Sequence, residues 1–168
     1  VVTHKKDLAD FTPYLTAEGA LRLDALLADQ NLRLGVASGR SYGPTIDAQL
    51  QTKTSNLQQV YQAESTSTLL KMLDHQRFDY TLSYPSEVVY YSPNHTDLQF
   101  YPIEGNNQLL PGRLSCSRDP ATDQVFADLT KLLRNNGHSK VFRDSYERWL
   151  PDYLIDTYRK MVAELKPE

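Results

Sequence analysis

The sequence predicts an α/β domain in which helices flank a mostly parallel sheet. Helical and extended hydrophobic patterns alternate along the first half of the chain. An apolar stretch at 32–36 runs into a loop rich in glycine and hydroxyl groups, and Pro44 then opens a helix. The length of 168 residues, with 40% hydrophobic and 23% charged residues, is ordinary for a globular domain with a real core.

The first half of the chain predicts three strands joined by helices. In chain order, the predicted elements are a helix over 16–29 with Thr16 as N-cap, a strand at 32–36, a helix carrying Ile46 and Leu50, a strand at 57–61, a helix that begins within 65–68, and a strand at 78–82. This alternation of strand and helix implies a parallel sheet.

The second half predicts more helix than strand. Asp119 and Pro120 form a good N-cap and first-turn pair for a helix that ends at Asn136 and Gly137. The other predicted elements are a helix over 85–91, strands at 98–103 and 113–117, a helix over 139–149, and a last helix from 152.

The loop at 38–42 predicts a site for an anion or a small polar ligand. Backbone N–H groups and the positive end of the following helix converge there, and the planar guanidinium of Arg40 suits a carboxylate. A simple chain-reversing turn with a solvated Arg40 is the alternative. The glycines at 35, 39 and 43 do not match the dinucleotide fingerprint, and the stretch 35–41 is one residue short of a phosphate loop.

Charge, cysteine and histidine exclude several function classes. The net charge is −3 with scattered basic residues, which argues against nucleic acid as a partner. The lone Cys116 is interpreted as a buried structural thiol in a strand, and the four histidines lack metal-ligand spacing. No carboxylate pair or nucleophile-base pair stands out, so we expect no catalytic residues, no metal and no cofactor.

The order of the elements resembles a known family. The strand before the glycine loop, the serine- and threonine-capped helix, the segment 73–82, two later strands and a closing helix pair are similar to the second lobe of type II periplasmic solute-binding proteins, especially extracellular solute-binding family 3. The resemblance covers residues 32–150. It implies a hinge-strand remnant and leading helix at 1–31, an α/β ligand-binding lobe at 32–150, and a C-terminal helix at 151–168 that packs on a missing first lobe.

The resemblance also implies which residues face the ligand. They lie in three segments, namely Ser38, Gly39, Arg40, Ser41 and Tyr42 after the first strand, Ser65, Thr66 and Ser67 at a helix start, and Ser83 and Tyr84 after the third strand. In amino-acid binders the last place commonly holds an aspartate, so Tyr84 argues against ordinary α-amino acids. Residues 65–67 can instead act as helix caps, Tyr84 can be a core or surface aromatic, and Glu87 fits a helix first turn.

The function implied by the resemblance is noncatalytic. We expect an exported, periplasmic protein that binds a small polar or anionic solute in a cleft between two lobes for uptake through an ABC transporter permease. The C-terminal helix could also mediate self-association. Two alternatives remain open: the extracellular ligand-sensing domain of a membrane receptor, and an enzyme built on the same fold.

Overall fold

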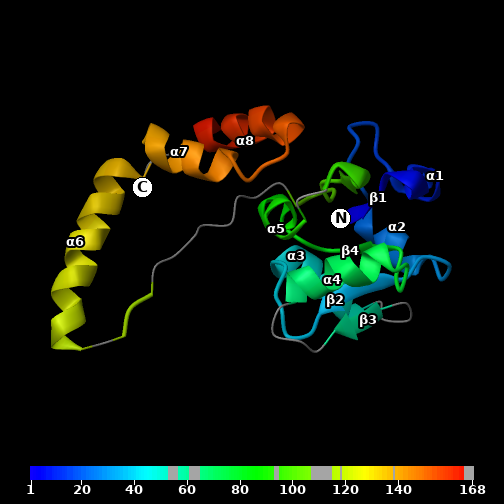
Figure 1. Ribbon diagram of the computed structural model, residues 1–168, viewed down its shortest axis with the longest axis horizontal. Helices are drawn as coiled ribbons and strands as arrows, with labels where there is room; N and C mark the ends of the chain where they lie inside the picture. The colour runs from blue at the N-terminus through cyan, green and yellow to red at the C-terminus, as the bar shows by residue number, and fades with distance from the viewer. Residues whose placement is uncertain are drawn as a thin grey trace. The chain divides into compact units, whose positions relative to one another are not determined.

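The computed structural model describes residues 1–52, 57–60, 65–92, 95–106, 115–117, 119–137 and 139–164. The chain divides into two compact units, Val1–Gln108 and Leu109–Glu168. This division differs from the boundaries predicted after residues 31 and 150, because residues 1–31 belong to the first unit and residues 109–150 to the second. Figure 1 shows the elements of both units, coloured along the chain.

A five-stranded mixed sheet forms the centre of the first unit. Its strands are β1 (Val2–His4), β2 (Leu34–Ala37), β3 (Leu57–Val60), β4 (Tyr80–Thr81) and β5 (Leu98–Phe100), in the order β3-β2-β4-β1-β5. β2 pairs in parallel with both β3 and β4, so the predicted parallel core is confirmed. Figure 1 shows β3, β2, β4 and β1 following one another across the sheet.

The N-terminal strand lies inside the sheet rather than beside it. β1 is antiparallel to both neighbours, with Val2 opposite Thr81 on one side and Phe100 on the other. The pairing extends to Val1, whose backbone O accepts a hydrogen bond from Tyr101 N at 2.9 Å. Because β1 runs antiparallel to β4, the start of β1 lies at the edge where β2 and β4 end.

Eight short helices connect the strands among the described residues of the first unit: η1 (Lys5–Asp7), α1 (Leu8–Phe11), η2 (Thr12–Tyr14), α2 (Leu23–Ala28), α3 (Pro44–Thr52), α4 (Ser65–Asp74), α5 (Pro85–Tyr91) and η3 (His95–Asp97). The helices predicted after β2, after β3 and after β4 are confirmed. The helix predicted over 16–29 is wrong in its first half. Thr16 N donates to Ala20 O at 2.7 Å around Gly19, whose φ is 79°, so the chain turns there.

The two faces of the sheet carry separate hydrophobic clusters. Successive side chains of a strand point to opposite faces, so Leu34 and Val36 pack in one cluster and Ala37 in the other. Leucines of α2 and Ile46 of α3 join the first cluster, whereas leucines of α4 and Val88 of α5 join the second. Helices therefore cover both faces, which leaves the ends of the strands as the places where loops gather.

Gly35 in β2 is required by close packing. A Cβ atom at this position would lie 2.3 Å from the ring of Phe78, which is 1% exposed. The carbonyl of Gly35 also accepts a hydrogen bond from Thr81 Oγ1 at 2.8 Å. A glycine in the middle of the strand thus lets the segment before β4 pack directly against β2.

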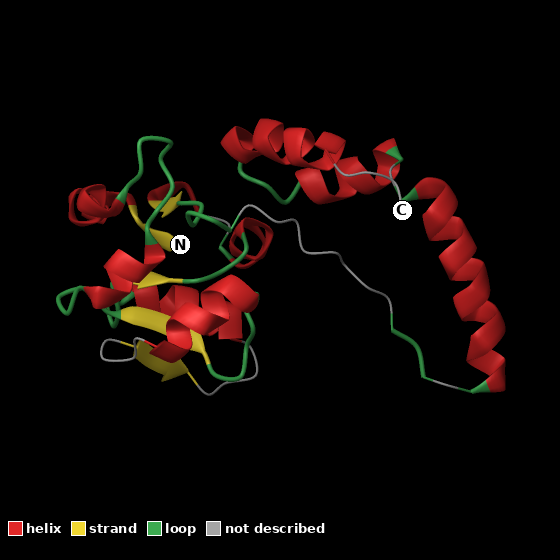
Figure 2. Ribbon diagram, turned by 180° about the vertical axis from the view of Figure 1, so that it is seen from behind, coloured by secondary structure: helices red, strands yellow, loops and turns green. Residues whose placement is uncertain are grey.

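The described part of the second unit is helical, as Figure 2 shows by colour. Its helices are α6 (Pro120–Asn136), α7 (Lys140–Glu147) and α8 (Asp152–Glu164). The predicted cap of α6 is confirmed, because the Asp119 carboxylate accepts from Ala121 N at 2.9 Å and from Thr122 N at 3.1 Å. None of the described helices is both long and apolar enough to cross a bilayer.

Two predictions for the start of the second unit fail. Residues 115–117 form no strand, and residues 113–114 of the predicted strand lie outside the described residues. Cys116 is exposed rather than buried, because this stretch has no strand partner that would cover it in the described part of the unit.

An ion-pair cluster joins α7 to α8. Glu147 is 7% exposed and accepts from Arg159 Nε at 2.9 Å and Nη2 at 2.7 Å. Hydrogen bonds from Arg159 hold the pKa of Glu147 below its ordinary value. Large apolar side chains of the second unit stay exposed, namely Val125, Phe126, Leu132, Val141, Phe142, Tyr146, Trp149 and Tyr153.

Candidate ligand-binding site

The carboxyl ends of β2 and β4 form the most distinctive edge of the first unit. The chain leaves β2 toward β3 on one side, and after β3 it crosses back to form β4 on the other side of β2. From β4 the chain continues to β5 on the far side of β1, so the connections that follow the adjacent strands β2 and β4 run in opposite directions. In open α/β sheets, ligands bind outside the carboxyl ends of strands at such a switch point.

Arg40 is the centre of a hydrogen-bonded cluster at this edge. Its Nη2 atom donates to both carboxylate oxygens of Glu87, at 2.8 and 2.7 Å. Its Nη1 atom donates to Oγ1 of Thr66 at 2.9 Å. The Arg40 side chain is 18% exposed, so its charge is largely withdrawn from water. One guanidinium thus links the loop after β2 to α4 and α5.

Glu87 receives further hydrogen bonds from hydroxyl groups. Oγ of Ser83 donates to the carboxylate at 3.0 Å, and Oγ1 of Thr66 donates at 3.2 Å. Glu87 lies in the first turn of α5, where the positive helix end also favours a carboxylate. Four hydrogen bonds from three donor atoms therefore fix this carboxylate in place, although its side chain is 33% exposed.

Two tyrosine rings lie beside the guanidinium. The carbon at the centre of the Arg40 guanidinium lies 5.4 Å from the ring centroid of Tyr42 and 5.3 Å from that of Tyr84. These distances are typical of cation–π contacts. Tyr42 is 6% exposed, its Oη accepts from Ala37 N at 3.1 Å, and burial raises its pKa. Tyr84 remains half-buried.

The structure brings together members of all three predicted segments. Arg40 and Tyr42 come from the first, Thr66 from the second, and Ser83 and Tyr84 from the third.

The other predicted site residues lie around this cluster in different roles. Ser41 Oγ donates to Asp47 at 2.5 Å, and Gly39 has a φ of 73° that serves the turn. The side chain of Ser65 lies outside the described residues. Ser38 and Ser67 lie on the same segments, but no described contact joins either of them to Arg40.

The predicted anion cradle is partly occupied by the chain itself. The backbone N–H of Tyr42, one of the donors expected for a ligand, donates to Asp47 Oδ1 at 2.8 Å. The guanidinium of Arg40 is committed to Glu87. The sequence offered little sign of this pairing, because the two residues lie 47 positions apart and each has a local explanation.

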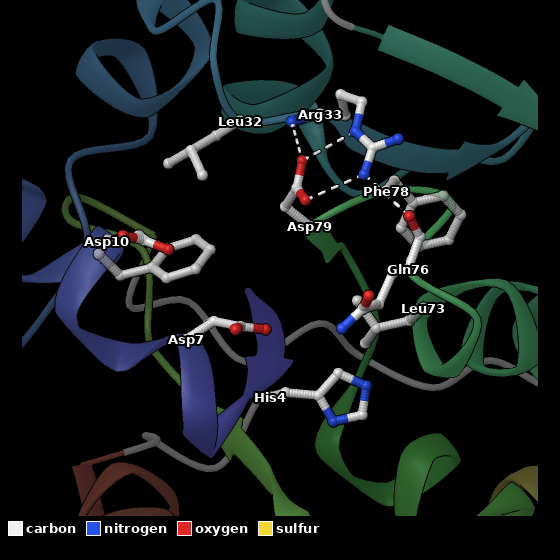
Figure 3. Close-up of a pocket in the computed structure, with 10 residues that line it drawn as sticks. His4, Asp7, Asp10, Leu32, Arg33, Leu73, Gln76, Phe78 and Asp79 are labelled. Atoms are coloured by element: carbon white, nitrogen blue, oxygen red, sulfur yellow. Dashed lines mark hydrogen bonds and ion pairs between the residues drawn. The ribbon is translucent and has the colours of Figure 1, made fainter.

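A second Arg–carboxylate pair lies at the opposite edge, where the parallel strands begin. Asp79 accepts from the backbone N of Arg33 at 2.7 Å, from its Nε at 3.0 Å and from its Nη2 at 3.1 Å. These bonds are the dashed lines around Asp79 in Figure 3. Hydrogen bonding to Asp79 raises the pKa of Arg33. The side chains are 42% and 29% exposed, which is more open to water than Arg40.

A small cavity of about 270 Å³ lies at this second edge and is drawn in Figure 3. Its lining includes the acids Asp7 and Asp10 together with His4, whose Nε2 lies 3.4 Å from Asp74. No group of His, Cys, Asp and Glu among the described residues has the arrangement of a metal site. The described polar groups of this edge therefore line a small charged cavity, and they are not arranged as the ligands of a metal ion would be.

The chain matches no protein-family model, no curated protein and no solved structure. The fold class is a mixed α/β unit followed by a helical unit, and the functional assignment depends on the geometry of the two sheet edges.

Proposed function

We propose that the first unit is a ligand-binding lobe of the kind found in type II periplasmic solute-binding proteins. The observation that carries this proposal is the meeting of three distant segments at the carboxyl ends of β2 and β4, with Arg40 bonded to Thr66 and Glu87 and flanked by Tyr84. Such a convergence of polar groups and aromatic rings at a switch point suits a small polar solute.

Two further features support the proposal. The segments that meet are the three that the family resemblance assigns to ligand contact, although only part of each takes part in the cluster. β1 enters the sheet between β4 and β5 and antiparallel to both, in agreement with the hinge-strand interpretation of the first residues. By the same resemblance, the protein acts outside the cytoplasm and delivers its solute to an ABC transporter permease.

The proposal is tested by mapping small solutes onto the 168-residue chain by NMR. The probes are sulfate, acetate, glycine and glucose, each added to millimolar concentration. We expect at least one probe to shift the backbone amides of Gly39, Gly43 and Tyr84, because these residues flank the Arg40 cluster. Shifts confined to the amides around Asp79, or to the second unit, would contradict the proposal.

A matched pair of variants controls for indirect effects. Lysine has a single nitrogen and cannot bond to Thr66 and Glu87 together as Nη1 and Nη2 of Arg40 do, so Arg40→Lys should abolish the shifts that the probe causes. Arg33→Lys makes the same change at the opposite edge of the sheet and should leave them intact. Equal responses in both variants would mean that the shifts report general loosening of the unit rather than binding at Arg40.

A further inference from the structure

The charges at the Arg40 edge are already balanced. Arg40 contributes the positive charge of the cluster, and Glu87 neutralises it at 2.7 Å. Asp47 lies on the loop side of the same edge, where it accepts from Ser41 Oγ and Tyr42 N. An anionic solute would therefore meet two carboxylates and no uncompensated cation among the described residues of this cluster, and like charges brought together disfavour binding.

The hydrogen-bonding capacity that the described contacts of Arg40 and Glu87 leave unused includes both donors and an acceptor. A guanidinium has five N–H donors. The described contacts of Arg40 use Nη2 for Glu87 and Nη1 for Thr66, so Nε–H and a second Nη1–H have no described protein acceptor. On Glu87, three of the four hydrogen bonds reach Oε2, whereas Oε1 accepts only from Arg40 among the described contacts. The pair thus offers donors and an acceptor side by side.

Hydroxyl groups on a solute match these donors and this acceptor better than charged groups do. A hydroxyl donates and accepts at the same time, so two neighbouring hydroxyls can bond to the guanidinium and to the carboxylate together. A carboxylate only accepts and is repelled by Glu87, and an ammonium only donates and is repelled by Arg40. The half-buried ring of Tyr84, 5.3 Å from the guanidinium carbon, adds a flat apolar surface beside the pair.

We infer that the solute bound at this edge is an uncharged ring compound with several hydroxyl groups, of the chemical class of a monosaccharide. This inference rests on the proposed function and narrows its range of ligands. It keeps the polar ligand expected from the sequence and excludes the anionic one, because Glu87 already neutralises the positive charge of Arg40 that would attract an anion.

The test compares sugars that share a ring and differ in the charge of one substituent. Glucose, glucuronate and glucosamine share one ring, as do galactose, galacturonate and galactosamine, and at about pH 6 each set carries charges of zero, minus one and plus one. Each is titrated into the 168-residue chain while the amide of Tyr84 and the Nε–H signal of Arg40 are followed by NMR. We expect the neutral member of at least one set to bind roughly tenfold tighter than both charged members.

Glu87→Gln tests the charge argument directly. This variant keeps the size of the side chain but leaves Arg40 without its counter-charge, so the preference should invert toward the uronate. A purely structural role of Glu87 would weaken all three sugars alike and would not invert their order. Asp79→Asn at the opposite edge is the matched control and should keep the wild-type order.

The outcomes separate this inference from the function on which it rests. Tighter binding of a uronate or an amino sugar to the wild-type chain overturns the inference and leaves the ligand-binding lobe in place. The same holds if acetate or glycine shifts the Arg40 edge while no sugar does. If no sugar and no other probe shifts that edge, both the proposed function and the inference are wrong.

Discussion

The two edges of the sheet carry the same pair of residue types in different surroundings. At the edge where β2 and β4 begin, Arg33 is 42% exposed and binds Asp79. At the edge where they end, Arg40 is 18% exposed and binds Glu87. An Arg–carboxylate pair therefore has no fixed role. The groups around it decide how its loss would change stability or binding.

The Arg33–Asp79 pair connects the segments just before the neighbouring strands β2 and β4. Asp79 accepts from the backbone N of Arg33, and the backbone O of Asp79 accepts from Thr3 Oγ1 at 2.9 Å. These bonds connect the segments that lead into β2 and β4 with the neighbouring strand β1. The exposed guanidinium adds little beyond this, since ion pairs in contact with water contribute little to stability.

The Arg40–Glu87 pair ties elements that lie far apart in the sequence. It holds the loop after β2, the start of α4 and the start of α5 at one point. Withdrawing the charge of Arg40 from water is costly, and an apolar pair of similar size would often serve stability as well. Under the proposed function the pair serves binding instead, because a solute would use the donors and the acceptor that the pair presents.

The largest effect is expected from Gly35→Ala, which acts on the packing between the edges. The new Cβ would lie 2.3 Å from the Phe78 ring, so the segment before β4 must shift. We expect the free energy of unfolding to fall by about 3 kcal/mol in urea denaturation. Adding Phe78→Leu should recover part of this loss. Strictly additive losses in the double variant would show that the clash with Phe78 is not the cause.

Glu87→Ala should have the next largest effect on stability. It leaves the mostly buried Arg40 without a counter-charge and removes the acceptor of Ser83 and Thr66, so we expect a loss of about 2 kcal/mol. Replacing Arg40 by methionine in the same chain removes the unpaired charge and should restore part of the stability. Urea denaturation of the two chains decides this. A double variant less stable than Glu87→Ala alone would contradict the charge argument.

Asp79→Ala should cost less, about 1.5 kcal/mol, mainly because the backbone N of Arg33 loses its acceptor. Arg33→Met keeps that backbone bond and removes only the exposed guanidinium, so we expect about 0.5 kcal/mol. Both values come from the same denaturation experiment. An Arg33→Met loss as large as that of Asp79→Ala would show that the ion pair, and not the backbone bond, fastens this edge.

Local signals in the sequence account for most of the fold that could be predicted. The Asp119–Pro120 pair fixes the start of α6 through side-chain bonds to the first turn, so three neighbouring residues contain the information. The segment 16–29 has a helical stripe, but the turn at Gly19 and the bridge from Leu21 to the distant Ile103 override the first half of it. Tertiary pairing of this kind leaves no local pattern.

The candidate site was predictable in its segments but not in its chemistry. Parallel strands bring their carboxyl ends together, so Arg40, Thr66 and Tyr84 could be placed near one another from the order of elements alone. The partner of Arg40 could not, because Glu87 already suits a helix first turn and its distance in sequence hides the pairing. The sequence therefore predicted a site for an anion or a small polar ligand, whereas the structure pairs the Arg40 guanidinium with the Glu87 carboxylate.

An NMR titration tests whether a solute binds at the Arg40 edge and not at the Arg33 edge. The Nε–H signals of Arg33 and Arg40 report on the two ion pairs in the same sample of the 168-residue chain. During titration with glucose and galactose, we predict that the Arg40 signal moves with saturation while the Arg33 signal stays in place. A signal from Arg33 that moves while that of Arg40 does not would contradict the assignment of binding to the carboxyl ends of β2 and β4.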